Sequence, residues 1–201
     1  RYAALAAGIN AFLGYGALNF MPSFAIRIYE VPVGLVGTWL ALIAGLAGAA
    51  GVYAGGHLSD NYCKRDDRWA YWVPGISTLV AGVLVLPTML ANNQYVMWGF
   101  YALVTLSHSI FLGPTIAMAH ALVGPRYRAL SSSVLFFVLN IIGLGLGPLT
   151  VGAISDALAP STGVNSIRWA IMSTALAAFI GAALYFKAAL HLRGDLKKSA
   201  A

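Results

Sequence analysis

Long apolar runs alternate with short polar gaps along the whole chain. A membrane-spanning helix needs about 20 consecutive, mainly apolar residues. Measured against that length, the pattern predicts six spans, each bounded by charge, proline or asparagine. The predicted spans are Tyr2–Phe24, Val33–Leu58, Trp69–Leu90, Tyr95–Val123, Leu130–Ser155 and Arg168–Leu192. We therefore expect an all-α membrane protein, a single six-helix bundle over residues 1–201 with a polar tail at 193–201.

The composition supports a bilayer as the solvent. The chain is 60% hydrophobic and 9% charged, whereas soluble domains average about 25% charged residues. The net charge of +6 raises the possibility of nucleic acid as a partner, but a nucleic-acid binder carries a basic face interleaved with aromatic residues. Here the basic residues lie in the gaps between apolar runs, so we expect lipid and no nucleic acid as partner.

The distribution of basic residues predicts the orientation. Lys and Arg concentrate in the cytoplasmic loops of membrane proteins. With a cytoplasmic N-terminus, only Arg27 and Arg168 lie outside. The inner set is then Arg1, Lys64, Arg65, Arg68, Arg126, Arg128, Lys187, Arg193, Lys197 and Lys198. Both termini are therefore predicted to be cytoplasmic, which in a bacterium means the inner membrane.

The gap after the second span contains an acid that orientation does not require. Its segment "GHLSDNYCKR" resembles the G-x-L-a-D-r-x-G-r-k loop of the major facilitator superfamily. Matching positions are Gly56, Leu58, Asp60, Lys64 and Arg65, while Asn61 and Cys63 depart from the pattern. The resemblance implies a conformational latch, in which the acid binds a helix N-terminus of the other half of a transporter. The alternative is a solvated loop of mixed charge.

Two further stretches resemble spinster-like members of that superfamily. They are "GYGALNFMPSFAIR" from Gly14 and the segment Gly124–Asp156. They fit the C-terminal half of a twelve-helix transporter, built as a 3+3 inverted repeat. "GGHLSD" and "VGAISD", three spans apart, fit such a repeat. The implied partner is an N-terminal six-helix half; a natural half-size protein that dimerises is the alternative.

Polar residues inside predicted spans are costly and therefore mark candidate sites. Helical spacing and the family's cavity helices single out Tyr15, Asn19, Thr105, His108 and Asn140 as candidates for lining a substrate cavity. His108 is titratable, and it is either a proton carrier or, as we favour, a neutral hydrogen-bonding group.

Small residues predict close helix packing in the fifth span, since helices in lipid associate where their backbones approach. Gly143, Gly147, Pro148 and Gly152 provide this packing, and the proline also permits a hinge. Arg27 and Glu30, at the predicted outer mouth, are expected to form an exposed ion pair; the alternative is that Arg27 attracts an anion.

No catalytic constellation is visible in the sequence. There is no Ser-His-Asp arrangement, no phosphate-binding Gly-rich loop and no histidine pair with metal-ligand spacing, so we expect neither an enzyme, nor a cofactor, nor a metal site. The resemblance implies a secondary active transporter that moves an amphipathic or lipid-like organic solute by alternating access, with proton coupling as the default expectation. The alternative function is a six-helix channel or scaffolding protein that acts as a homo-oligomer.

Overall fold

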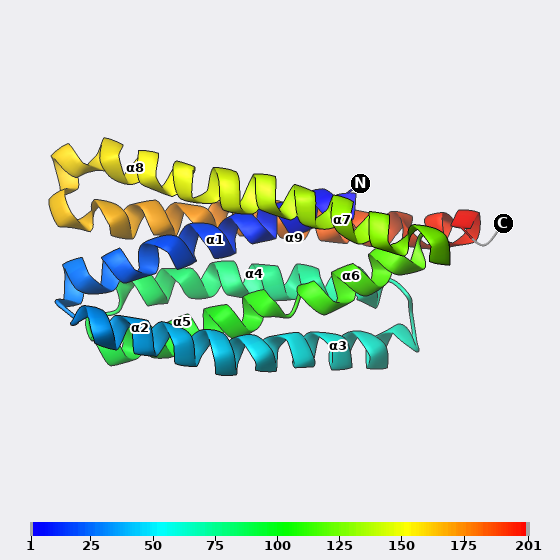
Figure 1. Cartoon of the computed structure of the whole chain (residues 1–201), viewed down its shortest axis with the longest axis horizontal. Coiled ribbons are helices and arrows are strands. Elements are labelled where there is room, and N and C mark those ends of the chain that lie inside the picture. The colour runs from blue at the N-terminus through cyan, green and yellow to red at the C-terminus, as the bar shows by residue number, and fades with distance from the viewer. Residues whose placement is uncertain (1, 200–201) are drawn as a thin grey trace.

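The computed structural model describes residues 2–199, with side chains described except at residues 195 and 197–199. Arg1, residues 200–201 and the side chains of Lys197 and Lys198, all used in the predictions above, therefore lie outside the described part. The described residues form helices joined by short turns, and they contain no strand. The long axes of the helices run side by side (Figure 1). The elements are α1 (Tyr2–Tyr29), α2 (Val33–Leu42), η1 (Ile43–Gly48), α3 (Ala49–Cys63), α4 (Trp69–Leu90), α5 (Gln94–Ser109), α6 (Leu112–Ala121), η2 (Pro125–Tyr127), α7 (Arg128–Leu139), η3 (Asn140–Leu146), α8 (Gly147–Thr162), η4 (Gly163–Asn165) and α9 (Ser166–Ser199).

Among the described residues, 5 helical stretches are long and apolar enough to cross a membrane. The longest, Pro125–Gly194, has 70 residues, but the chain reverses within it, so that α8 and α9 lie side by side (Figure 1). Gly163 occupies the reversal with a φ of 56°, a conformation that glycine adopts without steric cost. These helices make the chain a multi-pass membrane protein.

Burial within the bundle is uneven. Half of the most apolar window of α1 is buried, and 56% of that of α4, against 11% for the stretch Val33–Cys63. Helices α1, α4 and α9 pack on one another, so closely that a methyl group added to Gly82 of α4 would overlap the Cβ of Ala178. The core therefore lies along α1, α4 and α9, while the helix formed by α2, η1 and α3 is largely uncovered.

Helix α1 continues past the predicted end at Phe24 to Tyr29, whose hydroxyl donates a hydrogen bond to the Ala91 carbonyl oxygen over 2.6 Å. The next residue, Glu30, has a φ of 55° and turns the chain out of the helix. The predicted exposed ion pair between Arg27 and Glu30 is wrong, because no salt bridge joins the two side chains in the described part of the chain. The reason is that Glu30 has left the helical spacing that would place it above Arg27.

The predicted latch loop is mostly helix. Gly56, Leu58 and Asp60 lie in the last turns of α3, and only Lys64 and Arg65 lie in the turn that follows. The prediction ended the helix where the apolar run ended. Polar residues do not end a helix that continues beyond the membrane. In this polar part of α3, Asn61 Nδ2 donates a hydrogen bond to Nε2 of His57, one turn earlier in the helix (2.9 Å).

The fourth predicted span, Tyr95–Val123, is interrupted at Ile110 and Phe111, between α5 and α6. Pro114 has no N–H group, so the Ile110 carbonyl loses its usual helical partner. Gly55 of α3 packs directly on this carbonyl, because a Cβ at Gly55 would overlap the Ile110 oxygen. The interruption and the glycine together bring α3 against the α5–α6 junction.

Two helices contain π-helical segments. In η1 and η3 the backbone winds more widely than in an α-helix, and such segments are frequent at functional sites. The segment η3 lies between Leu139 and Gly147, and Pro148 follows Gly147. That proline cannot donate to the carbonyl four residues back, which favours the wider winding there. The fifth predicted span thus runs from Arg128 to Thr162, longer at both ends than predicted.

The predicted tail at 193–201 continues the last helix as far as Ser199. Arg193, in this extension, forms a 3.0 Å ion pair with Asp66 in the α3–α4 turn. The Asp66 carboxylate also accepts a hydrogen bond from the Arg68 backbone N–H (2.9 Å). That hydrogen bond, and then the Arg193 charge, lower the pKa of Asp66.

Replacing Asp66 by Asn is expected to lower the thermal stability of the protein slightly at neutral pH. Because the pKa of the carboxyl is lower in the folded state, its contribution is present above the ordinary carboxyl pKa and is lost as pH falls through the folded value. Melting curves of wild type and D66N should therefore converge in acid. Asp67→Asn in the same turn serves as control; a constant difference at every pH would contradict this assignment.

Candidate functional site

A pocket of about 310 Å³ lies between α1, α5 and α7, with η1 and α3 at its edge. Its volume lies at the lower end of the range for small-molecule sites, about 300–1,000 Å³. Most of its wall is apolar. The lining residues are Ala11, Leu13, Gly14, Tyr15, Ala17, Leu18, Ala44, Gly48, Val52, Tyr101, Val104, Thr105, His108, Ser109, Phe111, Leu112, Phe136, Leu139 and Asn140. Both π-helical segments reach this pocket, η1 through Ala44 and Gly48 and η3 through Asn140.

Four of the five predicted cavity residues meet in this pocket: Tyr15, Thr105, His108 and Asn140. They come from α1, α5 and η3, which are distant in sequence. Asn19 does not line it; its Nδ2 donates a hydrogen bond to the Tyr15 carbonyl oxygen (2.8 Å), on an exposed face of α1. The binding role of all five residues stays a prediction.

His108 is held by α1. Its Nε2 lies 3.0 Å from the Asn10 carbonyl oxygen. Because a carbonyl oxygen only accepts, Nε2 carries the proton and donates it. The ring packs edge-on against Phe111, with centroids 5.4 Å apart. It also covers Gly14, where a Cβ would overlap the ring. A glycine at position 14 is therefore what allows the imidazole to lie against α1.

The side chain of Asn10 went unnoticed in the sequence. Asn10 is fully buried, and neither its amide nitrogen nor its amide oxygen has a hydrogen-bond partner among the described residues. Burying an unsatisfied amide is costly. The available signal was a polar residue inside the first apolar span, one helical turn before Gly14.

Two other polar residues of the pocket, Thr105 and Asn140, bond to their own helices. Thr105 Oγ1 donates to the Tyr101 carbonyl oxygen (2.9 Å), and Asn140 Nδ2 donates to that of Phe136 (2.7 Å). Both bonds join residues four apart, the usual reach of a side chain back along a helix. The orientation of the two side chains is fixed by these bonds.

The predicted packing residues of the fifth span lie against α1. A Cβ on Gly143 would lie 2.5 Å from the Cβ of Ala11, and one on Gly147 would lie 3.0 Å from the Phe12 carbonyl oxygen. At Gly152 the nearest atom would be Phe20 Cζ, at 3.4 Å. Pro148 lies in the first turn of α8. These contacts support packing; the hinge role stays a prediction.

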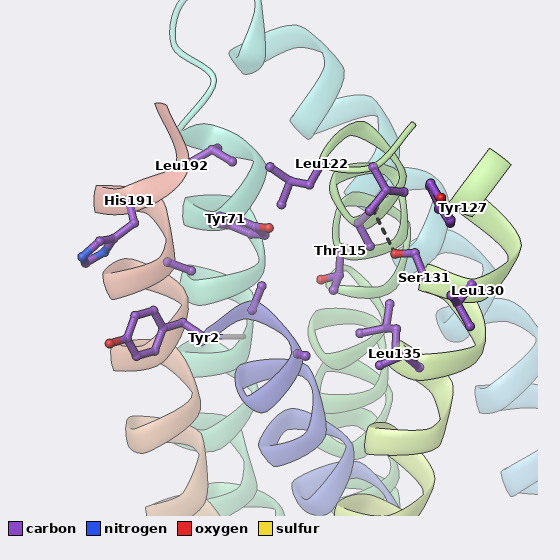
Figure 2. Close-up of a pocket in the computed structure, with 16 residues that line it drawn as sticks. Tyr2, Tyr71, Thr115, Leu122, Tyr127, Leu130, Ser131, Leu135, His191 and Leu192 are labelled. Atoms are coloured by element: carbon purple, nitrogen blue, oxygen red, sulfur yellow. Dashed lines mark hydrogen bonds between the residues drawn. The ribbon is translucent and has the colours of Figure 1, made fainter. Parts of the chain in front are cut away.

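A second pocket, of about 630 Å³, opens at the end of the molecule where α1 begins and α9 ends (Figure 2). In Figure 2, Tyr71 and Leu192 lie on one side of this space and Tyr127 and Leu130 on the other. On the second side, Ser131 Oγ of α7 donates to the Ala119 carbonyl oxygen of α6 (3.1 Å). This hydrogen bond joins α6 to α7 on one side of the pocket, and α4 and α9 form the other side.

Metal binding has no support in the described part of the chain. No group of three or more His, Cys, Asp or Glu side chains there could hold an ion. His191, which lines the second pocket, has its Nδ1 2.9 Å from the Lys187 carbonyl oxygen, and His120 forms a 2.6 Å hydrogen bond with Ser132.

Comparison with known proteins identifies the relatives. No family model matches the chain. An MFS-type efflux pump of Mycolicibacterium smegmatis is 30% identical over 188 residues, which cover 93% of this chain. Two crystal structures of a bacterial homologue of the human lysosomal transporter Spinster, both inward-facing, one unoccupied and one occupied, match 96% of the chain with TM-scores of 0.86 and 0.84, at 26% and 25% identity. The chain belongs to the major facilitator superfamily.

This major facilitator chain spans about half the length of the relatives it matches: 44% of the efflux pump and 48% and 49% of the two Spinster homologue structures. Its spinster-like resemblance is confirmed, as is the expected all-helical fold. These relatives are transporters rather than enzymes.

Proposed function

We propose that this chain is the C-terminal six-helix half of a secondary active transporter, which moves an amphipathic or lipid-like organic solute by alternating access. The observation that carries the proposal is the close structural match, at 96% coverage, to half of a Spinster homologue seen both unoccupied and occupied in inward-facing form. By analogy with the Mycolicibacterium efflux pump, the direction of transport is outward. Proton coupling is part of the proposal.

Matched contacts support a six-span count and a 3+3 inverted repeat. Gly51 and Gly147 are separated by as many residues as Asp60 and Asp156. Gly51 of the second span packs on α5, where a Cβ would overlap the Leu106 carbonyl oxygen, and Gly147 of the fifth span packs on α1. A two-fold relation that exchanges the first and fourth spans and the second and fifth spans interchanges these two contacts.

The uncovered face of the bundle supports an N-terminal half as partner. The stretch Val33–Cys63 is the least buried of the candidate spans. Large apolar side chains are exposed along it, among them Leu46 (72%) and Tyr53 (76%), and along α8 at Leu149 (69%). A second six-helix half and surrounding lipid would cover such a surface.

The positions of charge support cytoplasmic termini. Helices α1 and α9 place the N- and C-terminal ends at the same end of the bundle (Figure 1). The α3–α4 and α6–α7 connections, which carry Lys64, Arg65, Arg126 and Arg128, lie at that end too. The positive-inside rule makes this the inner end, in the inner membrane of a bacterium. The pocket of Figure 2 would then be the inner mouth, and Arg27 and Glu30 would lie at the outer one.

Asp60 is the proposed latch to the other half. It is exposed near the end of α3 and forms no ion pair within the described residues. Its side chain is therefore available to a helix N-terminus of the N-terminal half, where a negative charge is favoured. Gly56, Leu58, Lys64 and Arg65 complete the latch segment.

Transport by the full-length protein tests this proposal. In liposomes, the protein should move a fluorescent lysophospholipid or an amphipathic dye, faster when a pH gradient is imposed between about pH 5 and 8. Asp60→Asn should reduce the flux at least about tenfold, since a charged partner contact contributes about 1.5–3 kcal/mol, while Asp67→Asn in the neighbouring turn should not. A flux that does not change when the pH gradient is imposed would refute proton coupling. The absence of flux with every probe would refute the proposal that the protein is a transporter.

A further inference from the structure

We propose that the pocket of Figure 2 binds an anionic phospholipid of the inner leaflet, with an acyl chain against its apolar wall and the phosphate at a basic rim. The inference rests on the orientation proposed above, which places this end of the bundle at the cytoplasmic surface, but it does not require transport. The pocket volume of about 630 Å³ lies within the range of ligand sites. In the described part of the chain, this pocket shares no lining residue with the pocket between α1, α5 and α7.

The wall of the pocket is mainly apolar, and on the α7 side it is uncovered. Tyr127 at the end of η2 and Leu130 and Val134 of α7 line the pocket, and these side chains are 55%, 61% and 53% exposed. Leu192 of α9 lies across from them (Figure 2). Exposed apolar surface in a hollow marks a site for a ligand, a partner or a membrane component. An apolar chain placed between α7 and α9 would cover these side chains and remove them from water.

The polar groups of the wall are compatible with an apolar occupant. Ser131 donates to the Ala119 carbonyl oxygen, and the hydroxyls of Thr115 and Tyr185 form a 3.0 Å hydrogen bond. His191 Nδ1 donates to a backbone carbonyl oxygen of its own helix over 2.9 Å. Because these groups already have partners within the protein, covering them with an acyl chain does not leave them unsatisfied.

Basic residues flank the pocket on both sides. Arg126 and Arg128 are the chain neighbours of Tyr127, and both are exposed at the start of α7. From α9, Lys187 places its Nζ 4.7 Å from the ring centroid of Tyr2, which lines the pocket. None of these three cations forms an ion pair within the described residues. They are therefore available to an anion at the rim.

Acidic residues do not neutralise this rim. No acidic side chain lines the pocket among the residues that the structure describes. Asp60, Asp66 and Asp67, at the same end of the bundle, belong to α3 and the α3–α4 turn, and Asp66 is paired with Arg193. Basic pockets between membrane helices on the cytoplasmic side bind the head groups of anionic lipids. The charge around this pocket is of that kind.

An anionic phospholipid satisfies both parts of the site. A free phosphate would bind the cations but would leave the apolar wall in contact with water. A zwitterionic phospholipid has the chains, but its head group adds a positive charge to a rim that is already basic, which is unfavourable. The phosphate of an anionic lipid is attracted to the rim while its chain fills the hollow between α7 and α9.

Lipid binding to the purified full-length transporter tests the inference. The probes are dioleoyl phosphatidylglycerol, dioleoyl phosphatidylcholine and glycerol phosphate, added to delipidated protein in detergent and measured by native mass spectrometry. We expect phosphatidylglycerol to bind at least about tenfold more tightly than phosphatidylcholine, because each basic residue near an anionic lipid adds to the attraction. Glycerol phosphate, which lacks the chains, should not bind at the same concentrations.

Charge variants locate the head group. Arg126→Gln, Arg128→Gln and Lys187→Gln should each weaken binding of phosphatidylglycerol about fivefold, as the attraction per basic residue implies. Arg65→Gln is the matched control, because Arg65 is exposed at the same end of the bundle but lies in the α3–α4 turn, outside the pocket. It should leave binding of phosphatidylglycerol unchanged.

A pocket-filling variant locates the acyl chain. Val134→Trp places a large ring in the pocket and should weaken binding of phosphatidylglycerol at least about tenfold. Val83→Trp is its control, because Val83 of α4 is similarly exposed, at 49%, and does not line the pocket. Thermal unfolding checks that both tryptophan variants are folded.

Several results would overturn the inference: equal binding of phosphatidylcholine, equally tight binding of glycerol phosphate, or a loss in Arg65→Gln as large as in Arg126→Gln. Unchanged binding in Val134→Trp would overturn it too. So would the absence of lipid binding, which would mean that another part of the transporter fills the pocket. The lipid site and the proposed function fail separately. Selective binding of phosphatidylglycerol without flux in liposomes contradicts transport alone, and flux without selective binding contradicts the lipid site alone.

Discussion

Gly55→Ala is expected to destabilise the protein, although alanine is the better helix former. The added Cβ would overlap the Ile110 carbonyl oxygen, which is backbone at the α5–α6 junction and cannot move aside cheaply. Overpacking of this kind costs up to about 3 kcal/mol, and helix propensity returns about 1 kcal/mol. We therefore expect a net loss of about 2 kcal/mol, and a similar loss for Gly51→Ala, whose Cβ would overlap the Leu106 carbonyl oxygen.

A graded series tests the cause. Gly147→Ala places its Cβ 3.0 Å from the Phe12 carbonyl oxygen and should cost less; Gly152→Ala, with Phe20 at 3.4 Å, should be close to neutral. Gly37→Ala is the control, since nothing lies within 4 Å of its added Cβ and it gains only propensity. Thermal unfolding followed by tryptophan fluorescence in detergent gives the order. A loss in Gly37→Ala as large as in Gly55→Ala would show that close approach is not the cause.

The positions of the helices follow from the sequence wherever length in lipid is the constraint. Trp69–Leu90 begins and ends where predicted, because charged and polar gaps flank a run of sufficient length. The four predicted cavity residues that meet in one pocket, Tyr15, Thr105, His108 and Asn140, follow from the same solvent, lipid. A polar side chain in lipid must face the bundle interior or a cavity, so spacing along each helix indicates a shared face.

Features that depend on neighbouring helices could not be predicted. The break at Ile110 lies close to Pro114 and to the backbone contact at Gly55, and the π-helical segment η3 lies close to Pro148. The signals, Pro114 and Pro148, were present, but proline alone does not say whether a helix kinks, widens or breaks. The end of α3 at Cys63 was missed because the hydropathy pattern marks the edge of the membrane and not the end of the helix.

The hydrogen bonds made by the pocket's side chains were likewise invisible in the sequence. That His108 bonds to the backbone of Asn10 depends on how α5 lies against α1. Only a glycine at position 14 permits this contact. A list of polar residues therefore predicts where a site lies, whereas the hydrogen bonds within the site depend on how the helices pack against one another.

Asn10→Leu is expected to raise the stability of the protein while lowering its transport activity. The amide of Asn10 is fully buried and unpartnered among the described residues, and leaving such a group unsatisfied costs about 1–3 kcal/mol. Leucine has a similar branched shape without polar atoms, so a gain of about 1 kcal/mol remains after some overpacking. The backbone carbonyl that holds His108 is untouched by the change.

The free energy of unfolding and the transport flux of Asn10→Leu together show whether the buried amide has a role in transport. Asn140→Leu is the control for stability, because its side chain is exposed and its amide already bonds to Phe136, so a change within about 0.5 kcal/mol is expected. A gain in unfolding free energy with a fall in flux would mean that the chain keeps Asn10 for a step of the transport cycle, in which its amide meets a partner. A loss of stability would contradict this account, because it would show that the buried amide contributes to the folded state.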